Sequence, residues 1–512
     1  MQPRENAFTS GPALVGYISA LEFVVHLPNP GGYGFFTDEL YFMACGEHLS
    51  FGYVDMPPLT ALQAWAARGL FGDSLTAVRL FPTFAAAGLI LLTGALVRQF
   101  GGGRFAQVLA AVAVLLAPFF LGFSSYLSMN SIEPLLWMGC AYVLIRIIKT
   151  GDARLWLWFG LIAGIGLENK DTMLLFGFAL IAGLMMTPQR RLTANRWFVF
   201  GGLIALLIFL PNLIWMIQRH FPHLEMLANI RRNQRNIAPS PIGFVGLQLL
   251  GTQPVAAPVW IGGLFLLLLD ASYKEYRALG WAYVIALLIL LLMRGRFYYL
   301  APSYPMLFAA GAVGAERWLD RSHRYHLGWA YVALLVATGL AIAVNTLPLL
   351  PPVTYIAYTH LIGVSQPKFE HRQSSELPQL LADRCGWPEM VAAVAQVYNA
   401  IPSDERARTA IFAQNYGEAG AIDFYGPKLG LPKAISGHVN YWYWGPRNYT
   451  GESVIVLGNA RERLEKYFSK VEDKGAVGNP YAMASEHFEI YLCSQPKGWT
   501  FAQRWPELKT WD

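Results

Sequence analysis

Cysteine is scarce in this sequence, which has only four among its 512 residues. No two of them form a Cys-x-x-Cys pair, and this excludes a metal framework of that type. Cys140 lies within an apolar run, whereas Cys385 and Cys493 lie in a polar region near the C-terminus. The last two could form a disulfide if that region is extracytoplasmic, and their wide spacing is equally compatible with free thiols.

Charged residues are also scarce. Only 14% of the residues are charged and 54% are hydrophobic, with a mean hydropathy of +0.35. A water-soluble protein of this length could not keep that balance, so we expect a membrane protein. The net charge of +6 is modest and fits basic loops beside a membrane. No DNA- or RNA-binding module is visible, and no nucleic-acid partner is expected.

A cleavable signal peptide is not evident either. The apolar segment 11–27 continues into "PNPGGYGFFTDEL" without a small-x-small cleavage pattern, so we expect a retained first span. Further apolar runs follow, and a membrane helix needs roughly 20 residues. We predict about eleven spans, at 11–27, 76–98, 106–126, 130–149, 154–168, 171–187, 197–217, 244–269, 276–293, 297–316 and 327–348.

Lysine and arginine in the short connections predict the orientation. Basic connections such as "VRQFGGGR", "IRIIKTGDAR" and "TPQRRLTANR" alternate with less basic ones, so we place them and the N-terminus in the cytoplasm. The long first loop, 28–75, then lies outside. With an odd number of spans, the region that begins near residue 352 also lies outside.

The polar C-terminal region has the pattern of a small α/β domain. "RTAIFA" (408–413) and "SVIVLG" (453–458) are short β-like runs, and 415–426 carries apolar residues at helical spacing. We therefore predict an α-helical polytopic membrane domain, 1–351, and a soluble extracytoplasmic α/β domain, 352–512.

The first external loop contains adjacent acids, Asp38 and Glu39, after a glycine-rich stretch. Neighbouring residues on a helix point about 100° apart, so at most one of the two is expected to act as a base. The alternative is structural, because Thr37 or Asp38 could cap a short interfacial helix that begins here.

A second acid, Glu133, lies at the outer end of an apolar helix in "SMNSIEPLLW", with Pro134 at a tolerable first-turn position. An ionisable residue in or near a membrane span is costly, which makes it a functional candidate. The alternative is again an acid that interacts with a helix N-terminus.

Cations occur on the same predicted outer side. Lys170 lies in "GLENKDTMLL", and Arg294 and Arg296 precede Tyr298 in "MRGRFYYLAPSYP". A solvated turn with internal ion pairs would also explain Lys170, and snorkelling anchors would explain the arginines and the tyrosine. Together, these acids and cations could bind a phosphate-bearing lipid and activate a hydroxyl group.

The order of four motifs resembles that in the membrane glycosyltransferases of the C fold (GT-C). These motifs are the loop "DELYF…GYVDMPPL", then "SIEP", "LENK" and "RFYYLAPSYP". The resemblance is to bacterial relatives of the protein O-mannosyltransferases and of the lipid A aminoarabinose transferases. It implies a polyprenyl-phosphate-linked sugar as donor, inverting transfer without a nucleotide, and a lipid, polysaccharide or protein acceptor. It also implies a multi-pass protein of the bacterial cytoplasmic (inner) membrane with a periplasmic or extracellular active site.

The resemblance assigns roles to the candidate residues. Asp38 corresponds to the general base, with Glu39 as its neighbour, and Glu133 corresponds to a second acid that is Asp in many relatives. Lys170 matches a recurrent lysine. The sequence departs from the pattern at Met56, where relatives often carry His, Lys or Gln before the two prolines.

The expected chemistry suits these residues. A hydroxyl acceptor needs a carboxylate base, for which we expect Asp38. The lipid phosphate that departs needs positive charge, from Lys170 with Arg294 or Arg296, or from a divalent metal ion held by the acids. Two other classes could use the same charges, a flippase or transporter of lipid-linked sugars and a membrane scaffold without activity. A flippase is disfavoured because the charges gather at one surface and no inverted repeat is visible.

Overall fold

The computed structural model describes residues 7–235, 237, 239–363 and 375–511. Its contacts divide the chain into two compact units. The first unit comprises Met1–Pro28, Thr76–Trp215 and Ala238–Leu347, and the second comprises Asn29–Leu75, Met216–Ile237 and Pro348–Asp512. The second unit thus combines the first loop with the C-terminal region. The predicted domain boundary at residue 351 remains a prediction.

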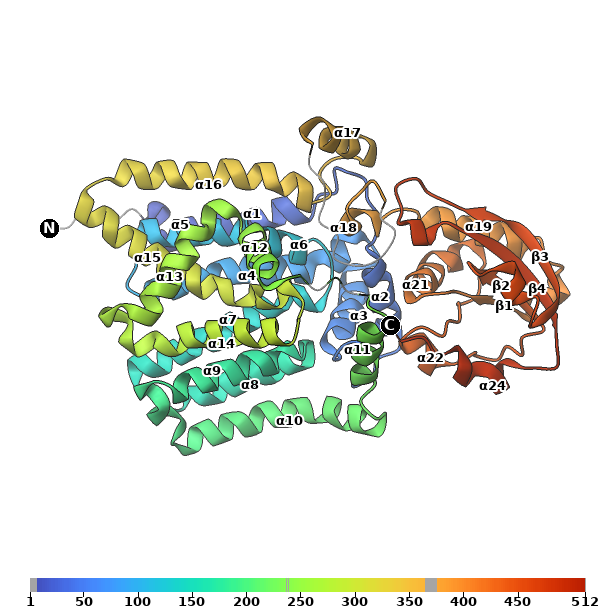
Figure 1. Ribbon diagram of the computed structural model, residues 1–512, viewed down its shortest axis with the longest axis horizontal. Helices are drawn as coiled ribbons and strands as arrows, with labels where there is room; N and C mark the ends of the chain where they lie inside the picture. Colours follow the sequence, from blue (N-terminus) through green and yellow to red (C-terminus); the bar gives the residue numbers. More distant parts are fainter. Residues whose placement is uncertain (1–6, 236, 238, 364–374, 512) are drawn as a thin grey trace. The chain divides into compact units, whose positions relative to one another are not determined.

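Each predicted apolar run contains helix in the structure (Figure 1). The helices of the first unit are α1 (Gly11–His26), α4 (Leu75–Gln99), α5 (Arg104–Leu115), α6 (Pro118–Ser124), α7 (Met129–Thr150), α8 (Leu155–Asn169), α9 (Thr172–Met185), α10 (Arg196–Gln218), α12 (Pro241–Gly251), α13 (Ala257–Leu269), α14 (Arg277–Leu292), α15 (Tyr304–Ser322) and α16 (Tyr325–Thr346), with the 3-10 segment η5 (Phe297–Ser303) before α15.

The lengths of these helices show which can cross a membrane unaided. Among the described residues, five helices are long and apolar enough, or up to seven if two bent pairs each form one span. The bends are 59° between α5 and α6 and 94° between α12 and the segment Pro254–Leu269. A proline begins the second half of each pair, and its missing N–H interrupts the helical hydrogen bonds. The predicted helical membrane class is confirmed, while the number of spans remains a prediction.

Burial within the bundle follows the apolar pattern of each helix. Residues 105–115 of α5 are all buried, which is typical of a helix that is apolar on every side. By contrast, α10 and α16 lie at opposite edges of the bundle in Figure 1 and expose large apolar residues such as Leu207 and Leu340. We infer that these exposed faces contact lipid.

The second unit is an α/β structure. Its sheet has the order β1-β2-β4-β3, with β1 parallel to β2 and the other pairs antiparallel. Its strands are β1 (Thr409–Phe412), β2 (Ser453–Leu457), β3 (Phe468–Val477) and β4 (Phe488–Pro496), and its helices are α2 (Thr37–Glu47), α3 (Leu59–Phe71), α11 (Pro222–Arg232), α17 (Pro352–Ile362), α18 (Gln379–Ala382), α19 (Trp387–Asn399), α20 (Ser403–Arg406), α21 (Tyr416–Tyr425), α22 (Asn440–Trp444), α23 (Arg461–Leu464) and α24 (Phe501–Arg504).

The predicted C-terminal α/β class is confirmed, since β1, β2 and α21 occupy the three predicted segments. The hairpin of β3 and β4 was not predicted. Most of β3 is exposed and its sequence, "FSKVEDKGAV", is largely charged or small, so it lacks the apolar alternation that signals a strand. All four cysteines, including Cys385 and Cys493, are free thiols.

The helix α21 packs closely on α2. A Cβ atom added to Gly420 would lie 2.8 Å from the backbone carbon of Leu40. Around this contact, the Val54 amide donates to Asn440 Oδ1 at 2.7 Å, and Lys433 pairs with Glu47 at 2.6 Å. The first loop and the C-terminal region are therefore joined by a close backbone contact and by polar bonds.

This contact predicts that Gly420→Ala lowers the melting temperature of the purified protein. The new methyl group would meet backbone atoms that cannot move aside, at a cost of about 1–3 kcal/mol. Gly69→Ala in α3 is the matched control, because nothing lies within 4 Å of its added Cβ. That variant should be neutral or slightly more stable, since alanine favours helix over glycine. Equal melting temperatures for wild type and Gly420→Ala would contradict the close packing.

Candidate functional site

The first turn of α2 places the predicted acids in different environments. Glu39 is fully buried, and its Oε2 accepts a hydrogen bond from the Phe36 amide at 2.9 Å. This carboxylate satisfies a backbone donor at the start of the helix, as in the reciprocal half of a capping box. A helix does begin here as expected, but its N-cap is Phe36, so neither Thr37 nor Asp38 caps it, and Glu39 supplies the bond instead. A catalytic part for Glu39 remains a prediction.

Asp38 is only partly buried and is held from the C-terminal region. The Tyr416 hydroxyl donates to Asp38 Oδ1 at 2.8 Å. Tyr416 is itself fixed, because its ring stacks on His438 with centroids 4.9 Å apart and its amide donates to His438 Nδ1 at 3.1 Å. The ring of Tyr41 lies 4.7 Å from that of Tyr416. The orientation of the Asp38 carboxylate therefore depends on residues nearly 400 positions away.

A second carboxylate, Asp55, interacts electrostatically with Asp38 and accepts a hydrogen bond from Tyr41. Burial raises its pKa to about 6, the negative charge of Asp38 adds to this rise, and a hydrogen bond from the Tyr41 hydroxyl opposes it. That bond measures 2.8 Å. A carboxyl group whose pKa is raised by burial and by a neighbouring carboxylate is typical of acid–base sites.

Asp55 and Tyr416 are absent from the predicted site. Asp55 lies in the quoted "GYVDMPPL" stretch, so an acid directly before a Met-Pro-Pro turn was an available signal. No sequence signal pointed to Tyr416, because a tyrosine in a helix with apolar spacing is expected to be a core residue. Only the fold brings it to Asp38.

In the first unit, Glu133 and Lys170 form a buried ion pair. Glu133 lies in α7 with 3% of its side chain exposed, and its Oε2 lies 3.0 Å from Lys170 Nζ, whose side chain is 12% exposed. Lys170 also donates to Asn130 Oδ1 at 2.7 Å, and the Thr172 hydroxyl donates to Glu133 Oε1. Because a buried carboxylate without a partner is very costly, the ion pair with Lys170 and the hydrogen bond from Thr172 hold Glu133 in place.

Aromatic rings of η5 cover the lysine. The Lys170 ammonium lies 4.3 Å from the ring centroid of Tyr299 and 5.6 Å from that of Tyr298. Arg296 donates to the Tyr298 hydroxyl at 3.3 Å. The structure therefore joins Glu133, Lys170, Tyr298 and Arg296 in one group, and this cationic surface is chemically suited to a phosphate.

Arg294 differs from Arg296. It is exposed, has a φ of 52°, and forms no side-chain ion pair with any residue that the structure describes. Its predicted contact with a lipid phosphate remains a prediction. Within the described ranges, no group of three or more His, Cys, Asp or Glu side chains is arranged to hold a metal ion.

The predicted site residues thus fall into two groups. Asp38 and Glu39 belong to the second unit, whereas Glu133, Lys170, Arg294, Arg296 and Tyr298 belong to the first. We call the first group, with Asp55 and Tyr416, the acidic group, and the second, with Tyr299, the phosphate group. Their meeting in one site remains a prediction.

The acidic group predicts opposite effects of two substitutions on the pKa of Asp55. Tyr41→Phe removes a hydrogen bond to the carboxylate, so the pKa should rise above its value of about 6. Asp38→Asn removes a nearby negative charge, so the pKa should fall. Infrared titration of the carboxyl band that is lost in Asp55→Asn measures both shifts.

The matched control is Tyr53→Phe, because the Tyr53 hydroxyl bonds to the backbone carbonyls of Cys45 and His48. This variant should leave the Asp55 titration nearly unchanged. A shift of the same sign in Tyr41→Phe and Asp38→Asn would contradict the described network.

Comparison with known proteins supports the fold. Residues 55–215 match the family model described as dolichyl-phosphate-mannose-protein mannosyltransferase. This range contains Asp55, Glu133 and Lys170. A sequence search among curated proteins finds no match.

Solved structures match over much more of the chain. ArnT from Cupriavidus metallidurans bound to undecaprenyl phosphate matches with a TM-score of 0.59 and 13% identity, covering 94% of this chain and 97% of that one. The apo state of the same protein matches with a TM-score of 0.58 and 14% identity, again covering 94% of this chain and 97% of that one. The apo oligosaccharyltransferase of Archaeoglobus fulgidus matches with a TM-score of 0.50 and 12% identity, covering 82% of this chain and 63% of that one.

Because these sequence identities are low, the structural matches are evidence for the fold alone. The family match is a separate sequence comparison, and its range takes in residues 55–75 of the second unit and 76–215 of the first. Together they confirm the predicted resemblance and support a membrane glycosyltransferase. This chain therefore has the C fold of the membrane glycosyltransferases, with a mannosyltransferase-type sequence pattern over residues 55–215.

Proposed function

We propose that this protein transfers a sugar from a polyprenyl-phosphate donor to a hydroxyl acceptor at the outer surface of the bacterial inner membrane. The proposal is carried by one observation, the partly exposed Asp38 carboxylate that Tyr416 holds beside a second acid in a chain with the C fold. The similar ArnT structure is bound to undecaprenyl phosphate, and this lipid supports a donor of the same class for the present chain.

In this proposal Asp38 is the general base. The acceptor hydroxyl has a pKa far above neutrality, so its attack on the anomeric carbon is assisted when a carboxylate takes its proton. The hydroxyl oxygen forms the new glycosidic bond as the bond from the anomeric carbon to the phosphate oxygen breaks, and the configuration inverts. Tyr416 orients the carboxylate through its 2.8 Å hydrogen bond.

The phosphate group receives the departing lipid phosphate. That leaving group is already an anion, so it needs positive charge more than a proton. Lys170 and Arg296 offer this charge, and the tyrosines beside them can donate hydrogen bonds to phosphate oxygens. Glu133 holds Lys170 in place and is a positioning residue in this scheme.

The proposal predicts that Asp38→Asn abolishes sugar transfer, with a loss of at least ~100-fold, because the base is removed. Purified protein in detergent is incubated with a polyprenyl-phosphate sugar, and the glycosylated product is measured. Asp73→Asn is the matched control, since Asp73 lies in the same loop, is exposed and pairs with Arg68. Wild-type turnover by Asp38→Asn would refute the base. If the wild type also forms no product, a flippase or a scaffold is favoured instead.

The buried ion pair predicts a separation of stability from activity. Lys170→Met leaves Glu133 buried without a cation and should destabilise the protein by about 3–5 kcal/mol. Glu133→Gln/Lys170→Met removes both charges and should recover most of the melting temperature, yet it should not recover transfer.

Lys149→Met is the control for this series, because Lys149 is an exposed lysine at the other end of α7. It should keep both stability and transfer. A double variant that is stable and fully active would show that Lys170 serves the fold alone.

A further inference from the structure

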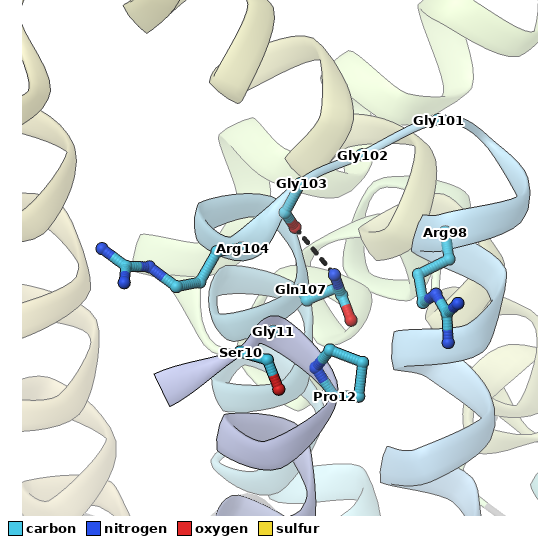
Figure 2. A pocket seen from close by; sticks show the side chains of 9 residues that line it. All are labelled: Ser10, Gly11, Pro12, Arg98, Gly101, Gly102, Gly103, Arg104 and Gln107. Carbon is cyan, nitrogen blue, oxygen red and sulfur yellow. Dashed lines mark hydrogen bonds between the residues drawn. The ribbon is translucent and has the colours of Figure 1, made fainter. Parts of the chain in front are cut away.

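A cavity of about 530 Å³ lies in the first unit, where α1 and α5 begin and α4 ends. Its lining residues are Ser10, Gly11, Pro12, Arg98, Gly101, Gly102, Gly103, Arg104 and Gln107 (Figure 2). The two groups described above contribute no residue to it. Its volume lies in the range of small-molecule sites.

Gln107 is the most informative residue of this cavity. Its side chain is 5% exposed, and its Nε2 donates to the Gly103 carbonyl at 3.1 Å. Its Oε1 is buried and has no hydrogen-bond partner. Figure 2 shows this amide oxygen beside Pro12. A buried acceptor without a partner costs about 1–3 kcal/mol, so a ligand that donates a hydrogen bond here would recover that loss.

Two arginines give the cavity positive charge. Arg98 and Arg104 lie on either side of Gln107 in Figure 2 and are exposed. Their side chains form no ion pair within the described part of the chain. A carboxylate close to Gly103, that of Glu316, is already engaged by the amides of Gly103 and Ala106 at 2.5 and 3.1 Å. The arginines therefore remain available for an anion.

The helix α1 adds two further features. It begins at Gly11, and its N-cap Ser10 supplies no side-chain hydrogen bond, so the N–H groups of its first turn, to which Pro12 contributes none, favour an anion. Beyond the cavity, α1 exposes an apolar stripe, with Tyr17 53%, Leu21 47% and Val24 67% exposed. Spacings of four and three residues place these side chains on one face, which suits an acyl chain.

We propose that this cavity binds an anionic phospholipid headgroup. Arg98 and Arg104, whose guanidinium groups point apart in Figure 2, turn toward the phosphate, a headgroup hydroxyl donates to Gln107 Oε1, and an acyl chain lies along the stripe of α1. Basic pockets between the ends of membrane helices are suited to such headgroups. The basic connections predict this end of the bundle to be cytoplasmic, opposite to the proposed transfer site. A soluble phosphate ester would share the headgroup chemistry and lack the acyl chain.

Native mass spectrometry of the purified full-length protein tests the proposal. Short-chain phosphatidylglycerol, short-chain phosphatidylcholine and glycerol phosphate are titrated separately. The wild type should bind phosphatidylglycerol about tenfold or more tightly than either of the other two. Equal affinity for the two lipids would overturn the proposal. Equal affinity for glycerol phosphate and phosphatidylglycerol would overturn the lipid as the source of the phosphate.

Variants locate the site. Arg98→Gln/Arg104→Gln should weaken phosphatidylglycerol binding by about tenfold or more, and Gln107→Met, which adds no charge, by about threefold or more. Arg190→Gln/Arg191→Gln is the matched control, because it removes two exposed arginines elsewhere in the first unit and should change binding by less than about twofold. An equal loss in both double variants would overturn the site. If the first double variant does not fold, unchanged binding by Gln107→Met would overturn it.

Discussion

The cost of an unpaired charge among apolar helices is the constraint on which the first unit depends. Glu133 is almost fully buried in a candidate membrane span, so it requires a cation, and Lys170 supplies it from the turn between α8 and α9. That requirement brings three helices and η5 together at one place, since the tyrosines of η5 cover the same lysine. A pair selected only for stability could be replaced by apolar residues. Its position close to Arg296 and the tyrosines of η5 fits a surface that binds phosphate.

In the second unit, the corresponding constraint is the orientation of a partly exposed acid. Asp38 is the second residue of α2, and Glu39 satisfies the amide of the N-cap residue Phe36, so the two adjacent carboxylates have different partners. The hydrogen bond that reaches Asp38 comes from α21, whose glycine allows close contact with α2. This arrangement gives the C-terminal region a physical part in the proposed chemistry, because it holds the base. It also explains why the first loop and the C-terminal strands belong to one compact unit.

Much of the fold follows from local sequence pattern. Apolar runs predicted the helices, and short β-like runs predicted β1 and β2, because these signals are carried by neighbouring residues. The strand β3 was not predicted because most of its residues are exposed and many of them are charged. Within the candidate site, Lys170 and Glu133 were predicted separately, and their 3.0 Å contact shows that both belong to one group. Tyr416 could not be predicted, since its distance from Asp38 along the chain leaves no periodic signal. Asp55 was missed because an acid in a loop is usually solvated.

The central claim is that the acidic group and the phosphate group act on one lipid-linked sugar. An electron cryo-microscopy structure of the full-length protein with undecaprenyl phosphate in a lipid nanodisc tests it most directly. The account predicts a phosphate oxygen at roughly 3 Å from Lys170 Nζ, with the Asp38 carboxylate facing the same cavity at about the width of one sugar ring. A phosphate bound away from Lys170, or an Asp38 carboxylate that faces a different cavity, would contradict it.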